Sequence, residues 1–229
     1  MRPYIVSHMM MSVDGRIDCA MTEQIDPTDS YYEALARLSC PTQLMGRVTM
    51  QMHYAVARPF LPADATPQGR EAVHVARQAG GYIVALDTHG RLCWPAAGFD
   101  GAPLLVITAE SCPKAYHDAL TRQGISWLAT GSDAIDLPRA MEILHDRFGV
   151  ERLAVTGGGH VNGAFLAAGL LDEVSVMVGP GIDGRQGMTS VFDGIDEPAR
   201  PATLLRLESV ERVAEGTVWL RYKFASSGK

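Results

Sequence analysis

The residues best suited to chemistry are three consecutive glycines, Gly157, Gly158 and Gly159, between a predicted strand and a predicted helix. The apolar run before them, 153–156, is typical of a buried parallel strand, and apolar residues then recur at helical spacing as far as Ala168. A turn without side chains exposes N–H groups at the start of a helix, where phosphate binds readily. The alternative is a plain tight turn that allows the helix to pack closely on the sheet.

The spacing of these glycines differs from the dinucleotide fingerprint of Rossmann domains. Gly157, Gly159 and Gly163 do not give G-x-G-x-x-G, and Asp172 and Glu173 come too soon to bind a ribose hydroxyl. The sequence also lacks a nucleophile elbow, a P-loop, a zinc-deaminase signature and any H-x-x-x-H pair. It therefore predicts a phosphate-bearing ligand outside a Rossmann domain, and no metal site.

The elements that must position these residues alternate between strand and helix. We expect strands at 3–11, 43–45, 82–86, 104–108, 125–129, 153–156 and 172–178, helices at 27–38, 113–122, 137–148 and 161–168, a short helix opening at 46–49, and a strand pair at 204–213 and 217–224. This order predicts an α/β fold with a mixed, mainly parallel sheet flanked by helices and a C-terminal antiparallel pair. Asp26 and Pro27 suit the N-cap and first position of the helix at 27–38.

Composition narrows the class of protein further. The chain has 229 residues, a net charge of −6 and a sequence pI of about 5.6, which argue against a nucleic-acid partner. Its apolar runs are too short to cross a bilayer, and its N-terminus has no signal-peptide pattern, so we expect no membrane partner. Four scattered cysteines without a C-x-x-C pair favour free thiols and a cytoplasmic location.

Four segments, in order over nearly the whole chain, carry a resemblance to a known family. They are RPYIVSHMMMSVDGRID, LMGRVTM, VALDTHGR and LAVTGGGHVNGAFLAAGLLDEVSVMVGPGIDG. Together they resemble the pyrimidine reductase domain of riboflavin biosynthesis, the RibD C-terminal type of the dihydrofolate reductase-like superfamily. The resemblance implies a single reductase domain at 1–225, with 226–229 as a disordered tail, and a homodimer. It also implies NADPH as cofactor and an activity like that of 5-amino-6-(5-phosphoribosylamino)uracil reductase, which opens a ribose ring to a ribityl chain.

The resemblance also assigns roles to individual positions. It implies that main-chain N–H groups of the glycine turn hold the cofactor pyrophosphate, that Thr49 contacts the cofactor phosphates, that Thr88 lies near the adenosine 2′-phosphate, and that Met10 lies beside the nicotinamide. The complete predicted cofactor set is Met10, Thr49, Thr88, Gly157, Gly158, Gly159, His160, Val161, Asn162 and Gly163.

Substrate and proton transfer involve a second set of positions. Arg37 matches a family arginine that holds the substrate phosphate, and Asp26 and Thr156 complete the predicted substrate set. Asp14 and His53 are the predicted catalytic residues, because an acid or a bound water must supply a proton. Four of them also have a structural interpretation: Asp14 as a turn former, Asp26 as a helix cap, Arg37 as a solvated helix residue and His53 as a surface helix residue.

Two departures from the family pattern concern the substrate. Thr156 stands where the family often has a glutamate, and His53 stands at another common acidic position. Two alternatives therefore remain open: a related reductase of folate or of another small carbonyl or imine, and an NADP-binding module without turnover. Activity on a ribosylaminopyrimidine phosphate, and none on dihydrofolate, would favour a pyrimidine reductase over both alternatives.

Overall fold

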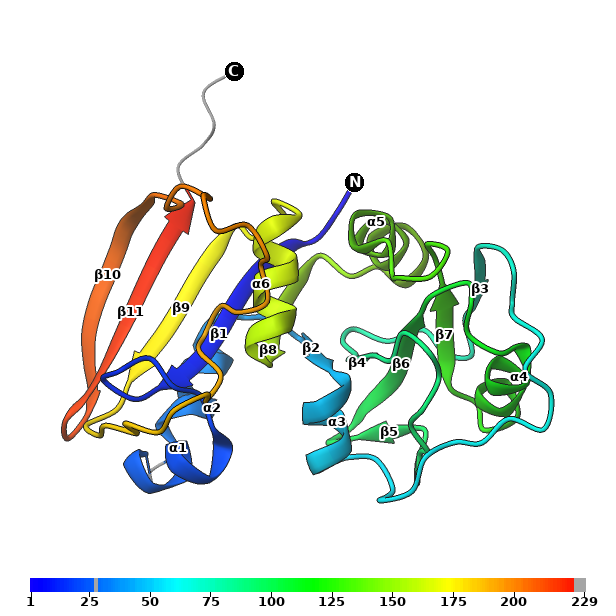
Figure 1. Ribbon diagram of the computed structural model, residues 1–229, viewed down its shortest axis with the longest axis horizontal. Coiled ribbons are helices and arrows are strands. Elements are labelled where there is room, and N and C mark those ends of the chain that lie inside the picture. The colour runs from blue at the N-terminus through cyan, green and yellow to red at the C-terminus, as the bar shows by residue number, and fades with distance from the viewer. Residues whose placement is uncertain (27–28, 225–229) are drawn as a thin grey trace. The chain divides into compact units, whose positions relative to one another are not determined.

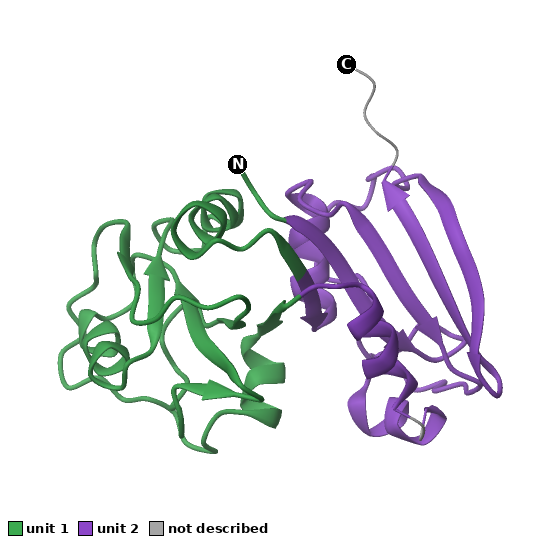
Figure 2. Ribbon diagram, turned by 180° about the vertical axis from the view of Figure 1, so that it is seen from behind, with its two compact units in different colours: residues 1–3, 41–153 green, residues 4–40, 154–229 purple. Residues whose placement is uncertain are grey.

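The computed structural model describes residues 1–26 and 29–224, and the chain divides into two compact units (Figure 2). Unit 1 holds residues 1–3 and 41–153, and unit 2 holds residues 4–40 and the chain from 154 onward. The predicted tail at 226–229 and Pro27 of the predicted helix lie outside the described residues. The single reductase domain remains a prediction.

Unit 1 is built on parallel strands in the order β2-β4-β6-β7, with β3 antiparallel to β7 and β5 antiparallel to β6 (Figure 1). Its elements are β2 (Thr42–Gly46), α3 (Arg47–His53), β3 (Ala72–His74), β4 (Ile83–Leu86), β5 (Gly98–Phe99), β6 (Ala102–Thr108), α4 (Lys114–Arg122), β7 (Ser126–Ala129) and α5 (Leu137–Phe148). The central strands are buried because helices and loops cover both of their faces.

Local signals explain why α5 has the predicted bounds. Asp136 accepts a hydrogen bond from the N–H of Arg139, a proline follows in the first turn, and Gly149 ends the helix at φ 67°. A side-chain cap at the start and a left-handed glycine at the end satisfy helix groups that would otherwise lack partners.

Unit 2 carries strands in the order β10-β11-β9-β1-β8. Its elements are β1 (Tyr4–Met11), α1 (Cys19–Ile25), α2 (Ser30–Arg37), β8 (Arg152–Gly157, whose first two residues are assigned to unit 1), α6 (Gly159–Ala167), β9 (Glu173–Val178), β10 (Leu205–Ala214) and β11 (Thr217–Phe224). β1 and β9 are parallel, whereas β11 is antiparallel to both β9 and β10. The predicted sheet class and the C-terminal antiparallel pair are therefore confirmed.

Two layers of side chains flank the sheet of unit 2. One face of β1 and β9, with Val6, Met10 and Met177, packs against α2. The opposite face, with Met9 and Val176, packs against the segment around Val191. Residues of β1 therefore alternate between two environments, and Met10 lies on the α2 side.

Some predicted elements need correction. The helix expected at 27–38 begins at Ser30, and α1, β3 and β5 were not predicted. Asp26 follows α1 as its C-cap rather than directly preceding α2. Its carboxylate still accepts from Ser30 Oγ (2.7 Å) and from the N–H of Tyr31 (3.1 Å), so it caps the first turn of α2 from a distance.

Candidate functional site

The glycine turn has the geometry of an anion site. Gly158 has φ 80° and ψ 131°, and α6 begins at Gly159 without a side-chain cap. The N–H groups of Val161 and Asn162 donate to the carbonyl of Gly158. Within the described part of the chain, the N–H groups of Gly159 and His160 have no acceptor. These donors at the start of a nine-residue helix suit a phosphate group.

The individual glycines serve different purposes. A Cβ at Gly158 would have no atom within 4 Å, so this residue borders open space. A Cβ at Gly159 would overlap the carbonyl oxygen of Ser190, and one at Gly163 would overlap that of Asp193. Gly158 therefore fits the ligand-binding interpretation, because it leaves room for a ligand. Gly159 and Gly163 fit the packing interpretation, because they allow close contact with another segment.

Next to Met10 on β1, a buried polar network surrounds His8. Its Nδ1 lies 2.9 Å from Ser175 Oγ, which also accepts from Trp219 Nε1 at 2.7 Å. Its Nε2 lies 3.2 Å from the carbonyl of Tyr31, and the two rings are stacked with centroids 4.5 Å apart. Burial lowers the pKa of His8 to about 4, so its ring is neutral at neutral pH.

Thr156 lies near the end of β8, which neighbours β1 in the sheet. Because strand side chains alternate, Thr156 shares a face with Ala154, which packs in the same cluster as Met10. Its Oγ1 is buried, and so is Oδ1 of Asn162 on α6; within the described residues neither atom has a hydrogen-bond partner. A buried polar atom without a partner costs free energy, which marks both as places where a ligand or water can bind.

Arg37, at the end of α2, already has an anionic partner. Its guanidinium donates to both carboxylate oxygens of Glu211 on β10, at 2.8 and 2.6 Å, and lies over the ring of Trp219. The pair holds the pKa of Glu211 below its usual value. To bind a substrate phosphate, Arg37 would have to release Glu211.

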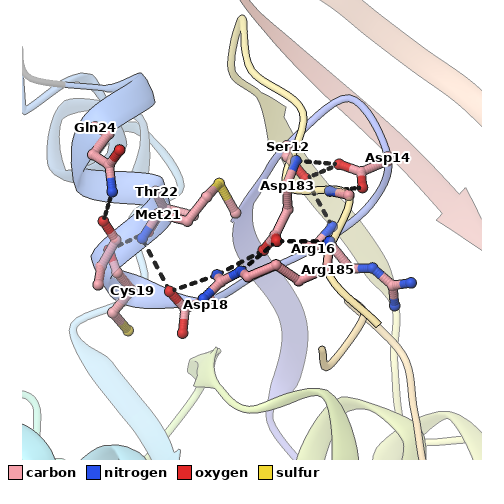
Figure 3. A network of polar contacts seen from close by, with 12 residues as sticks. Ser12, Asp14, Arg16, Asp18, Cys19, Met21, Thr22, Gln24, Asp183 and Arg185 are labelled. Atoms are coloured by element: carbon pink, nitrogen blue, oxygen red, sulfur yellow. Dashed lines mark hydrogen bonds and ion pairs between the residues drawn. The ribbon is translucent and has the colours of Figure 1, made fainter. Parts of the chain in front are cut away.

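The side chain of Asp14 is bonded to a distant loop of unit 2, as Figure 3 shows. Its carboxylate accepts from Ser12 Oγ (2.6 Å) and from the N–H groups of Asp183 (3.0 Å) and Gly184 (2.9 Å). The bond from Ser12, followed by the two main-chain bonds, holds the pKa of Asp14 well below its usual value.

The remaining predicted residues belong to unit 1. Thr49 is the third residue of α3 and is half-buried, and His53 is its last residue and is exposed. Thr88 follows β4, and its carbonyl accepts from the N–H of Ala109 at 3.0 Å. Asp87 shapes this turn because its buried carboxylate accepts from two main-chain N–H groups and from the hydroxyl of Tyr116. The predicted cofactor set is therefore divided between the two units.

In residues 1–26 and 29–224, no group of three His, Cys, Asp or Glu side chains is placed to hold a metal ion. Over the same residues, no helix has the length and apolar character needed to traverse a bilayer.

Similarity to known proteins extends over most of the sequence. The model of the RibD C-terminal domain family matches residues 3–219. A 2,5-diamino-6-ribosylamino-4(3H)-pyrimidinone 5′-phosphate reductase of Methanothermobacter thermautotrophicus is 30% identical over 206 residues, covering 87% of this chain and 88% of that protein. A reductase of the same name from Archaeoglobus fulgidus is 34% identical over 228 residues, covering 94% and 96%.

Solved structures show the same fold at lower identity. RibD of Acinetobacter baumannii, form 2, gives a TM-score of 0.71 at 19% identity over 98% of this chain, and this chain covers 58% of that RibD chain. Rib7 of Saccharomyces cerevisiae, a riboflavin biosynthesis reductase, gives a TM-score of 0.60 at 18% identity, covering 98% of this chain and 90% of Rib7.

The fold and the relatives together define an oxidoreductase with a dihydrofolate reductase-like fold. The chain belongs to the RibD C-terminal domain family, the reductases of riboflavin biosynthesis, which confirms the resemblance drawn from its four segments. Membership implies a nicotinamide cofactor.

Proposed function

We propose that this protein uses NADPH to reduce 2,5-diamino-6-ribosylamino-4(3H)-pyrimidinone 5′-phosphate, opening its ribose to a ribityl chain. The observation that carries the proposal is a glycine turn whose N–H groups at Gly159 and His160 have no acceptor in the described residues. The chain is also 30% and 34% identical to two reductases named for that substrate. The sequence alone favoured the deaminated uracil form of the substrate. The two archaeal relatives favour the diaminopyrimidinone.

The residues present fit the cofactor. Open space beside Gly158 and the N–H groups of Gly159 and His160 would take the pyrophosphate, with Gly157, Val161, Asn162 and Gly163 around them. Thr49 and Thr88 would contact the phosphates and the adenosine 2′-phosphate, and the main chain of Met10 would lie beside the nicotinamide. When bound, the nicotinamide supplies a hydride, and the protein supplies its position and excludes water.

The substrate would lie on the face of unit 2 that carries Met10 and Thr156. The unpartnered Oγ1 of Thr156 would hydrogen-bond the substrate. Asp26 shapes the start of α2 beside this face, and Arg37 would take the substrate phosphate after releasing Glu211. The ionised Asp14 is a poor proton donor, so we assign the proton to His53 or to a bound water.

Steady-state assays test this proposal. NADPH and NADH are each supplied with the diaminopyrimidinone phosphate, its deaminated uracil counterpart, and dihydrofolate. We expect NADPH oxidation to be fastest with the diaminopyrimidinone phosphate and absent with dihydrofolate. Tight NADPH binding without turnover on either pyrimidine would instead identify a cofactor-binding module.

We also propose that the protein is a homodimer in the cytoplasm. Leu207 and Val210 of β10 are 49% and 59% exposed, and a register shift after Leu207 places both on one face, opposite Tyr222 and Leu220 of β11. On β9 the same face is already covered at Val176, which packs against Val191, so the exposed apolar face lies on β10 and β11. A second copy would cover it with an identical apolar face, because two-fold symmetry pairs a surface patch with itself.

Sedimentation equilibrium tests the dimer. Val210→Lys is expected to give a monomer, and Glu215→Gln, at the exposed hairpin turn, is expected to leave the dimer intact. A monomeric unmodified protein would contradict this part of the proposal.

A further inference from the structure

The turn that follows β1 and the loop that follows β9 are joined through one carboxylate (Figure 3). Asp14 accepts from Ser12 in its own turn and from the N–H groups of Asp183 and Gly184 in the loop. All three donors bind the charged form, and bonds to an ionised carboxylate are stronger than neutral ones. These contacts point to a role in holding the loop.

Further bonds join the same two segments, here called the Asp14 turn (12–17) and the β9 loop (179–193). They run from Val13 N to Gly181 O (2.8 Å), from Arg16 Nη1 to Met188 O (2.6 Å) and from Ile17 N to Thr189 O (3.3 Å). Within the β9 loop, Arg185 pairs with Asp183 and also with Asp18, just beyond the Asp14 turn. The loop is therefore held along most of its length.

The far end of the β9 loop lies directly behind the glycine turn. The N–H of Asp193 donates to the carbonyl of Gly159 (3.0 Å), and Asn162 Nδ2 donates to the carbonyl of Val191 (2.8 Å). The β9 loop and the start of α6 are in close contact, because even a Cβ at Gly159 would overlap the carbonyl of Ser190. A shift of the loop must therefore displace the start of α6.

We propose that Asp14 is a positioning residue for the nicotinamide cofactor. It fixes the β9 loop, and the loop fixes Gly159 and the N–H groups that hold the pyrophosphate, so Asp14 acts on the cofactor without touching it. This inference rests on the proposed function, which assigns the pyrophosphate to the glycine turn. It also replaces proton donation as the role of Asp14.

Asp14→Asn is the informative substitution. An asparagine keeps the shape of the side chain, but its NH₂ group would face the N–H of Asp183 or Gly184, donor against donor. Asp14→Ala leaves those N–H groups to water, so the asparagine variant should be at least as impaired. Glu215→Gln removes the same charge from an exposed turn of unit 2 and serves as the control.

The test combines NADPH titration, steady-state kinetics and amide hydrogen exchange. Loss of one or two charge-assisted bonds in Asp14→Asn should raise the Kd for NADPH about tenfold. At saturating NADPH, kcat should stay close to that of the unmodified protein. The amides of Val161, Asn162 and Asp193 should exchange faster in this variant and not in Glu215→Gln.

An unchanged Kd for NADPH in Asp14→Asn would overturn the inference. So would a large loss of kcat at saturating cofactor, because that result assigns proton transfer to Asp14. If the unmodified protein binds neither NADPH nor NADH, the proposed function fails. Hydrogen exchange would still decide whether Asp14 positions the turn, and unchanged exchange at Val161 and Asn162 would refute it.

Discussion

Replacing Gly158 by alanine separates the ligand-binding interpretation of the glycine turn from the packing interpretation. The backbone of Gly158, at φ 80° and ψ 131°, lies where side-chain-bearing residues are rare. A Cβ there meets no protein atom within 4 Å, so the substitution introduces backbone strain and a methyl group facing open space. Gly159 is a poorer probe, because any side chain there would overlap Ser190.

The expected size of the effect follows from the strain. A residue other than glycine in this region costs about 1–3 kcal/mol, and the free protein can relieve that cost by shifting the turn. Binding of the pyrophosphate requires the original geometry, so the cost returns as lost affinity. Since 1.4 kcal/mol is a factor of ten, the Kd for NADPH should rise about fivefold to 150-fold.

Fluorescence titration with NADPH, alongside urea unfolding, measures both consequences of Gly158→Ala. Gly169→Ala is the matched control: Gly169 follows the other end of α6, has φ 65° and also borders open space. The control should lose about 1 kcal/mol of stability without a change in Kd. A folded Gly158→Ala protein with the Kd of the unmodified protein would refute a cofactor site at this turn.

Three further predictions concern stability and the substrate. Burial lowers the pKa of His8 from 6.5 to about 4, so the unfolded chain takes up the proton first and stability should fall by roughly 3 kcal/mol as pH drops through that range. His8→Gln should remove this loss in urea unfolding measured from pH 6.5 down to about 4, and an unchanged pH dependence would contradict it. Arg37→Ala should raise KM for the phosphorylated substrate but not for NADPH. Glu211→Gln should lower the substrate KM, because it weakens the pair that Arg37 must release. An equal rise in both KM values in Arg37→Ala would instead mean that Arg37 has a structural role. Gly163→Ala, whose Cβ would overlap a loop carbonyl, should cost about 1–3 kcal/mol in the same unfolding assay, whereas Gly80→Ala should not.

Strong local signals made much of the fold predictable. The helix at 137–148 was placed correctly because its cap, early proline and terminal glycine are all local. The short helix α1 was missed because its cap, Asp18, is followed by only seven residues with one buried side chain, Met21. Asp26 is correctly predicted to cap this helix, but the predicted start of α2 is three residues early, because Asp26 caps Ser30 and Tyr31, four and five positions further along the chain.

The candidate site was less predictable because its contacts join distant segments. The sequence alone does not decide between ligand binding and close packing for Gly159 and Gly163, which approach the 189–193 segment, although glycines four residues apart on one helix face suggest contact with another backbone. Pairing of Asp14 with the loop at 183–184 depends on β1 and β9 being neighbours in the sheet. No local pattern encodes that adjacency, so the sequence predicts a turn or a catalytic acid at Asp14 but not its pairing with this loop.

A crystal structure of the protein with NADP⁺ bound tests the central claim most directly. We expect pyrophosphate oxygens within hydrogen-bonding distance of the N–H groups of Gly159 and His160, and the cofactor in the open space beside Gly158. A cofactor bound elsewhere, with these N–H groups facing only water, would contradict it.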